Sequence, residues 1–142
     1  MSKIITDQSI LTQPSQDISV LEYDSVFGQL ELQLAQSKFG VGLAAPQLGT
    51  LKRAFIINYK GQRFRFANSE VVSGRYPDLG IEGCLSIPGR EFRVQRYKRV
   101  TIKDDINGTQ EYRNMLARII QHEHDHTRGI TLLQSGEEIQ IL

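Results

Sequence analysis

The chain has 142 residues, of which 39% are hydrophobic and 23% are charged, and its formal net charge is +1. These values predict one compact domain, residues 1–142, with a hydrophobic core, and they exclude a strong overall bias toward nucleic acid or membranes. The sequence has no signal-peptide pattern and no long apolar stretch, and its single cysteine excludes an internal disulfide, so we expect a cytoplasmic protein without a membrane span.

The N-terminal part is expected to form an extended arm, residues 1–20, followed by one amphipathic helix from about 23 to 38. Asp24 or Ser25 is predicted to cap this helix, and Gly40 is predicted to close it. The buried stripe of the helix would consist of Val26, Leu30, Leu34 and Phe39.

Small residues dominate the next stretch, residues 40–47, GVGLAAPQ. The missing side-chain bulk would let either a neighbouring element or a ligand approach the backbone closely. Tight packing alone is the commoner reason for such a run. Gln47 ends the stretch with an amide that can donate a hydrogen bond.

Strands are predicted in the middle of the chain. Residues 53–58 form an apolar run typical of a buried strand, and residues 63–67 alternate as a half-exposed strand does. Residues 68–80 are rich in loop-forming residues, and we expect only a short edge strand there, at Val71 and Val72.

Residues 82–86, EGCLS, contain the only cysteine, Cys84. A buried cysteine is more often a small hydrophobic residue than a ligand. A thiolate on a glycine-flanked loop can nevertheless come close to a helix, so Cys84 is a candidate metal ligand.

Basic and apolar residues alternate over residues 90–103, which predicts a strand with a basic outer face. Solvation is the usual reason for such a face, and contact with a peptide carboxylate or a polyanionic partner is the functional alternative. Asn107-Gly108 then predicts a hairpin turn.

All three histidines lie within residues 122–126, HEHDH, which contain the pattern H-E-x-x-H. Apolar residues at three- and four-residue spacing from Tyr112 onward predict a helix that Gly129 caps. On a helix His122 and His126 share one face and can bind one metal ion, while Glu123 can act as a general base. The alternative interpretation is a solvated polar helix end.

The same helical stripe carries Met115 and Ile119, which are predicted to line a pocket beside the metal. Arg118 lies near the same stripe and can point to the pocket rim, but a solvated charge is the preferred interpretation. Catalytic sites of this kind usually have three protein ligands and a water, so two histidines leave one ligand to be supplied, and Cys84 is the candidate.

Three motifs in this order, GVGLAAPQ, EGCLS and QHEHDH, resemble those of the peptide deformylase family, G-x-G-x-A-A-x-Q, E-G-C-x-S and H-E-x-x-H. The resemblance extends from about residue 25 to residue 133. The expected fold class is α+β, a single compact domain with antiparallel strands around a central metal-binding helix. The resemblance implies an enzyme that removes the formyl group from the N-terminal formylmethionine of newly made polypeptides by attack of a metal-bound hydroxide.

The resemblance also implies the parts of the site. One divalent metal is expected, ferrous iron in the family, with zinc, nickel or cobalt able to replace it. Glu123 would be the general base, and Gln47 with the backbone N–H of Leu85 would stabilise the oxyanion. The implied metal ligands are Cys84, His122 and His126, with water as the fourth ligand.

The formyl-Met peptide would bind as an added strand, with its methionine in a pocket. The implied substrate-binding residues are Val41, Gly42, Gly83, Arg96, Met115 and Ile119. His124 would point away from the metal. The ribosome is a candidate partner, but the chain ends shortly after the motif, so the C-terminal docking helix of many bacterial members is not expected. Sequence-specific nucleic acid is not an expected partner.

Two rival functions remain open from the residues alone. One is a zinc metallopeptidase of the thermolysin type, in which Glu137 or Glu138 replaces Cys84 as third ligand. The other is a non-catalytic metal-binding or regulatory protein. Metal content of the corresponding variants, and the activity of a Glu123 variant, distinguish these alternatives.

Overall fold

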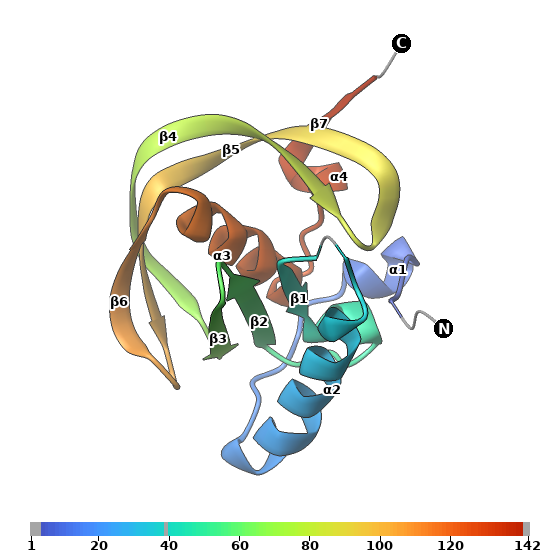
Figure 1. Ribbon diagram of the computed structural model, residues 1–142, viewed down its shortest axis with the longest axis vertical. Helices are drawn as coiled ribbons and strands as arrows, with labels where there is room; N and C mark the ends of the chain where they lie inside the picture. Colours follow the sequence, from blue (N-terminus) through green and yellow to red (C-terminus); the bar gives the residue numbers. More distant parts are fainter. Residues whose placement is uncertain (1–3, 39, 141–142) are drawn as a thin grey trace.

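Helix α3 (Asn114–Thr127) lies between two antiparallel sheets in the computed structural model of the chain (Figure 1). The structure describes residues 4–38 and 40–140. The mixture of helices and antiparallel sheets agrees with the predicted α+β class. Residues 122–126 lie in the last turns of α3, so the H-E-x-x-H pattern is helical, as expected.

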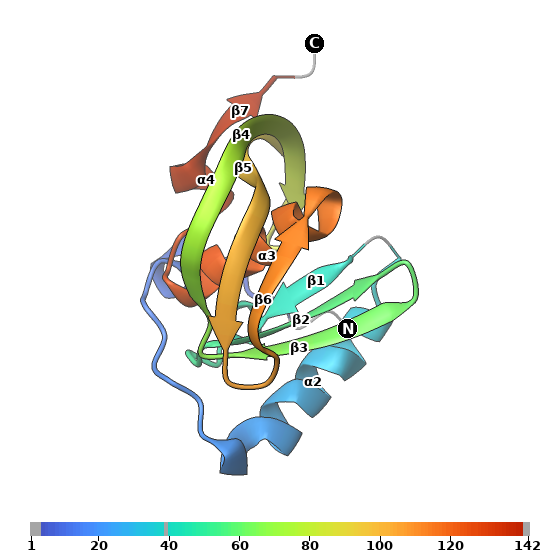
Figure 2. The same ribbon diagram turned by 90° about the vertical axis from the view of Figure 1, so that its left-hand side faces the viewer.

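The first sheet has the order β1-β2-β3 and consists of β1 (Gly42–Ala44), β2 (Ala54–Tyr59) and β3 (Gln62–Ala67). The two predicted strands in this region are therefore confirmed to within one residue. Lys60 and Gly61 connect β2 and β3 with positive φ values of 51° and 79°, as a tight hairpin turn requires. Helix α2 (Tyr23–Ala35) packs against this sheet (Figure 2).

The second sheet has the order β4-β5-β6, with β7 also paired to β5. Its strands are β4 (Glu70–Cys84), β5 (Ile87–Asp104), β6 (Gly108–Arg113) and β7 (Gly136–Ile139). The edge strand expected at Val71 and Val72 is present, but the loop expected over the rest of 68–80 was wrong, because β4 pairs with β5 along nearly its whole length. This strand lies at the sheet edge, where glycine, proline and polar residues are tolerated, so its sequence has no strand-like alternation.

The helix boundaries differ from the prediction at several points. The N-terminal arm contains two short helices, α1 (Gln8–Leu11) and η1 (Val20–Glu22). Because η1 runs directly into α2, the predicted cap residues Asp24 and Ser25 lie inside the helix. Helix α2 ends at Ala35, before Gly40, and Phe39 lies outside the described residues. The other three predicted stripe residues of α2 are buried, as expected.

The apolar spacing from Tyr112 left the start of α3 open, with Asn114 as a residue that can delay it. The helix begins at Asn114, and Tyr112 pairs with Val100 in the second sheet. Asn114 has a φ of 58°, and this left-handed conformation turns the chain from β6 into α3. At the other end, the N–H of Gly129 donates to the carbonyl of His126, and the N–H of Ile130 donates to the carbonyl of Asp125. These bonds form a Schellman motif, which confirms the predicted glycine cap.

Three hydrophobic clusters hold these elements together. The first lies between α2 and the first sheet, the second joins both sheets to α3, and the third packs one end of the second sheet against α4 (Leu132–Ser135). A second 3₁₀ helix, η2 (Ala45–Leu48), follows β1. In the described part of the chain, no helix has both the length and the apolar character needed to cross a membrane.

Helix α2 offers a matched test of the core. Leu30 is 0% exposed, whereas Leu32, on the same helix, is 67% exposed. We expect Leu30→Ala to lower the free energy of unfolding by about 2–5 kcal/mol, because it removes packed atoms and leaves a cavity. Leu32→Ala should change it by less than about 0.5 kcal/mol. Urea unfolding of both variants checks this, and equal effects would contradict the described packing of α2.

Candidate metal centre

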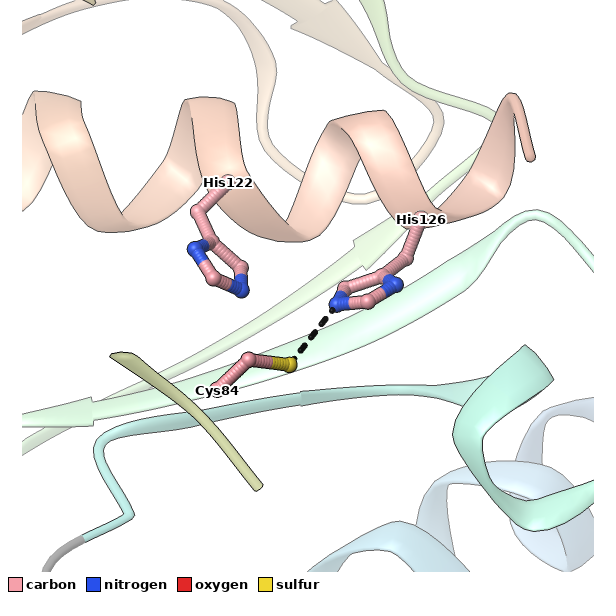
Figure 3. Close-up of side chains that lie close together, drawn as sticks. All are labelled: Cys84, His122 and His126. Carbon is pink, nitrogen blue, oxygen red and sulfur yellow. Dashed lines mark hydrogen bonds between the residues drawn. The ribbon is translucent and has the colours of Figure 1, made fainter. Parts of the chain in front are cut away.

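Helix α3 and the end of β4 bring three potential ligands together. His122 and His126 are one turn apart on α3, with ring centroids separated by 5.2 Å. Cys84 is the last residue of β4, and its Sγ lies 3.5 Å from His126 Nε2. The three side chains point toward one another (Figure 3), and their candidate ligand atoms all lie within 4.8 Å of each other.

The donor set suits a transition metal. One thiolate and two imidazoles are a ligand combination that zinc and its neighbours in the first row accept. Within the described residues, Oε1 of Glu123 is buried beside these side chains without a hydrogen-bond partner, which is costly unless a ligand or water completes the site. The residues present therefore fit a bound metal ion.

The alternative third ligands do not reach this cluster. Glu137 and Glu138 lie on β7, and Glu138 forms a two-bond ion pair with Arg90. Among the residues that the structure describes, the only metal-ligating group of this kind contains Cys84 and neither glutamate. The geometry therefore favours the thiolate over a carboxylate as third ligand.

The carboxylate of Glu82 fixes the orientation of His122. Oε1 of Glu82 lies 2.8 Å from His122 Nδ1, so a proton on Nδ1 is donated to the carboxylate and Nε2 remains for the metal. Arg96 donates two further bonds to Glu82, of 3.0 Å and 2.9 Å. Burial alone would raise the pKa of Glu82, but the bonds from His122 and Arg96 outweigh burial and lower the pKa to about 2. Glu82 is therefore a stable anion behind the site.

Glu123 lies beside the cluster, packed against the backbone of β1. A Cβ atom on Gly42 would lie 2.7 Å from Glu123 Oε2, so only glycine leaves room for this carboxylate. The group that approaches the backbone of this glycine-rich stretch at Gly42 is thus the side chain of Glu123 from helix α3. Burial raises the pKa of Glu123 to about 7, which suits a group that must both accept and release a proton near neutral pH.

The amide of Gln47 is held in one orientation. Its Oε1 accepts a 2.9 Å hydrogen bond from the N–H of Ala44, and its Nε2 donates to Ser86 Oγ at 3.1 Å. Nε2 also lies 3.6 Å from Cys84 Sγ. The side chain is 1% exposed, and the acceptors within reach of its amide N–H groups are Ser86 Oγ and Cys84 Sγ.

A cavity of about 670 Å³ opens onto this site. The predicted site residues that line it are Val41, Gly42, Gln47, Gly83, Cys84, Leu85, Met115, Ile119, His122 and Glu123. His126 lies deeper and is 1% exposed. Arg96, which was expected to bind substrate, is not among the residues that line this cavity. Its guanidinium forms ion pairs with Glu82 and Asp125 instead.

Two features of the site escaped the sequence analysis. The expectation of a solvated Arg118 was wrong, because this residue is buried and ion-paired with Glu82. The position of Arg118, four residues before His122 and on the helix stripe that faces the site, was the sequence feature that could have indicated its burial. Glu82 is the first residue of the EGCLS motif, but the sequence analysis did not predict its contacts with His122, Arg96 and Arg118. His124 behaves as expected, since it turns away to bond Ser69 Oγ at 2.8 Å.

Comparison with known proteins gives one consistent result. Residues 1–140 match the family model described as polypeptide deformylase. A peptide deformylase from Dictyoglomus thermophilum is 41% identical over 103 residues, which cover 70% of this chain and 67% of that protein. A peptide deformylase from Syntrophomonas wolfei is 41% identical over 107 residues, covering 72% and 70%.

Solved structures give the same answer. A peptide deformylase from Synechococcus elongatus, in complex with actinonin, has a TM-score of 0.82 and 32% identity, with 94% of this chain and 77% of that chain covered. Peptide deformylase from Thermotoga maritima has a TM-score of 0.84 and 26% identity, with 95% and 97% covered.

Because Glu82 is buried and Glu138 is exposed, the same Glu→Gln substitution should destabilise the protein far more at Glu82 than at Glu138. Glu82→Gln should lower the free energy of unfolding of the metal-free protein by about 3 kcal/mol, the low end for breaking a buried ion pair, because the buried guanidinium groups of Arg96 and Arg118 lose the anion that they share. Glu138→Gln breaks an ion pair of the same two-bond geometry on the surface, and little change is expected there. Urea unfolding at neutral pH measures both, and a small effect at Glu82 would contradict its structural role.

Proposed function

The chain belongs to the polypeptide deformylase family, whose members are metal-dependent enzymes that remove N-formyl groups from nascent peptides, and from this membership we propose how its residues act. We propose that residues 1–142 form one catalytic domain that hydrolyses the formyl amide of N-terminal formylmethionine. The observation that carries the proposal is the cluster of Cys84, His122 and His126, with ligand atoms within 4.8 Å of one another at the end of a cavity.

Cys84, His122 and His126 would hold one divalent metal ion. Ferrous iron is the metal we propose, with zinc, nickel or cobalt as replacements. When bound, such an ion lowers the pKa of a water to about 7 and polarises the carbonyl group to be attacked. The hydrogen bond from His122 to Glu82 supports this assignment, because it leaves Nε2 of the imidazole free for the metal.

Glu123 moves the proton in this proposal. Its carboxylate takes a proton from the attacking water as the water oxygen bonds to the formyl carbon. When the C–N bond breaks, Glu123 delivers that proton to the leaving amine, and formate is the second product. The raised pKa of Glu123, about 7, supports both steps at neutral pH.

Gln47 and the backbone N–H of Leu85 would donate to the oxyanion that forms on the formyl group. The N–H of Ala44 and the hydroxyl of Ser86 already orient the amide of Gln47, and the N–H that faces Cys84 Sγ in this structure would be the one that donates to the oxyanion. One such donor contributes about 3 kcal/mol to transition-state stabilisation in comparable sites.

The peptide would bind along the backbone of Val41, Gly42 and Gly83, with its methionine side chain against Met115 and Ile119. All five residues line the cavity. Arg96 acts in this proposal by holding Glu82 rather than by touching the peptide. We place the enzyme in the cytoplasm, where formylated nascent chains are made.

The direct test is release of formate from formyl-Met-Ala-Ser by anaerobically purified protein. Formate should appear together with one equivalent of free amine. Cleavage of a peptide bond without formate would instead support the metallopeptidase, and metal binding without either reaction would support the non-catalytic alternative.

Glu123→Gln preserves the shape of the side chain but removes its basicity. We expect hydrolysis to fall by at least about 10²-fold, the lower range for loss of a general acid–base group, while the metal content stays unchanged. Formate release and metal analysis on the same preparation measure the two quantities. Full activity in this variant would contradict the proposed proton transfer.

Cys84→Ser tests the third ligand. Because a hydroxyl is a much weaker ligand than a thiolate, we expect most of the bound metal and most of the activity to be lost. A cysteine that serves only for packing would tolerate serine with full metal content. The parent iron protein should also lose activity in air faster than nickel-substituted protein, since oxygen attacks the ferrous ion and its thiolate.

A further inference from the structure

Arg118 is a buried cation that the proposed reaction does not use. It lies on α3, is 8% exposed, and forms part of the cavity wall together with Ile119 and Met115. Burying a guanidinium is costly unless its charge and its N–H groups are satisfied. The groups that compensate this cost therefore show which parts of the protein Arg118 holds together.

The guanidinium of Arg118 joins three groups of the β4–β5 hairpin. Nη1 donates to Glu82 Oε2 at 2.6 Å and to the backbone carbonyl of Val94 at 3.1 Å. Nη2 donates to the backbone carbonyl of Asp78 at 2.8 Å. One side chain from α3 thus binds the main chain of β4, the main chain of β5 and the carboxylate behind His122.

The sequence of β4 also accommodates this contact. Gly80 pairs with Val94, and a Cβ atom at Gly80 would lie 2.7 Å from Arg118 Cζ. The guanidinium therefore lies directly over a backbone position without a side chain. The guanidinium of Arg118 is therefore held in two independent ways, by close packing over Gly80 and by the ion pair with Glu82.

The contacts of Arg118 connect the two elements that carry the three candidate metal ligands. Cys84 lies on β4, two residues after Glu82, whereas His122 and His126 lie on α3. We propose that Arg118 is a positioning residue, which fixes the β4–β5 hairpin on α3 and so sets Cys84 against His122 and His126. The inference rests on the metal site of the proposed function and adds a residue that acts on the candidate metal ligands through the hairpin that carries Cys84.

Three substitutions test this role. Arg118→Met keeps much of the side-chain volume but removes all the hydrogen bonds. Arg118→Lys keeps the charge but lacks the planar fork that binds several acceptors at once. Gly80→Ala keeps the arginine at position 118, but the new methyl group would push its guanidinium aside. The contact is then perturbed without any change in the charge of the protein.

Two matched variants serve as controls. Arg113→Met removes an exposed cation just before α3, one that contacts Glu111 and not the cluster. Gly28→Ala adds a methyl group on α2 where no atom lies within 4 Å of the new Cβ. Neither residue belongs to the proposed site, and both controls should bind metal as the parent does.

The measurements are the dissociation constant for Co²⁺, obtained by competition with a chelator, and the absorption spectrum of the cobalt protein. We expect Arg118→Met to weaken binding by about 10–100-fold, the usual effect of losing a group that orients metal ligands, and to change the thiolate–cobalt bands. Arg118→Lys and Gly80→Ala should shift both readouts in the same direction by smaller factors.

A purely structural role gives a different result. If Arg118→Met is less stable in urea but binds Co²⁺ with parental affinity and an unchanged spectrum, the proposal is overturned. If that variant does not fold, parental affinity and spectrum in both Arg118→Lys and Gly80→Ala overturn it equally. If the parent itself binds Co²⁺ without any dependence on Cys84, the proposed metal site fails first and this inference fails with it.

Discussion

The buried carboxylate of Glu82 is the interaction on which the site depends. It accepts hydrogen bonds from Arg96 and Arg118 and from the imidazole of His122, and it lies two residues before Cys84. Sheet, helix and candidate ligands therefore meet at one anion. Removing that anion would take away the most buried counter-charge of both arginines and the acceptor of His122, so the site is sensitive to a change at Glu82.

A buried charge cluster is an expensive way to join a sheet to a helix. Apolar residues of similar volume often stabilise a fold as well as a buried ion pair does, because they avoid the cost of desolvating the charges. Orientation is a better explanation than stability for these residues. Hydrogen bonds to a guanidinium and a carboxylate have defined directions, which van der Waals packing lacks, and a metal site requires ligands within a few tenths of an ångström.

The small residues of β1 serve the same site from the opposite side. Gly42 lets Glu123 approach the backbone, and this close packing leaves the residue only 5% exposed. This burial is also what raises the pKa of Glu123 to about 7. A fold that needed only a packed core would gain stability from a larger residue at Gly42, so the glycine is explained by the carboxylate beside it.

The sequence by itself determined the elements with a strong local signal. The spacing of His122 and His126 fixed their common face, and the single cysteine made Cys84 the leading third ligand. Tertiary structure alone decided what residues 68–80 form, because β4 is specified by pairing with β5 and not by its own propensity. It also decided that Arg118 is buried, since burial of a charge depends on partners such as Glu82 that lie 36 residues away in the chain. Local periodicity carries no information about such distant partners. For this physical reason the candidate ligands could be named from the sequence, whereas the groups that contact them from distant parts of the chain could not.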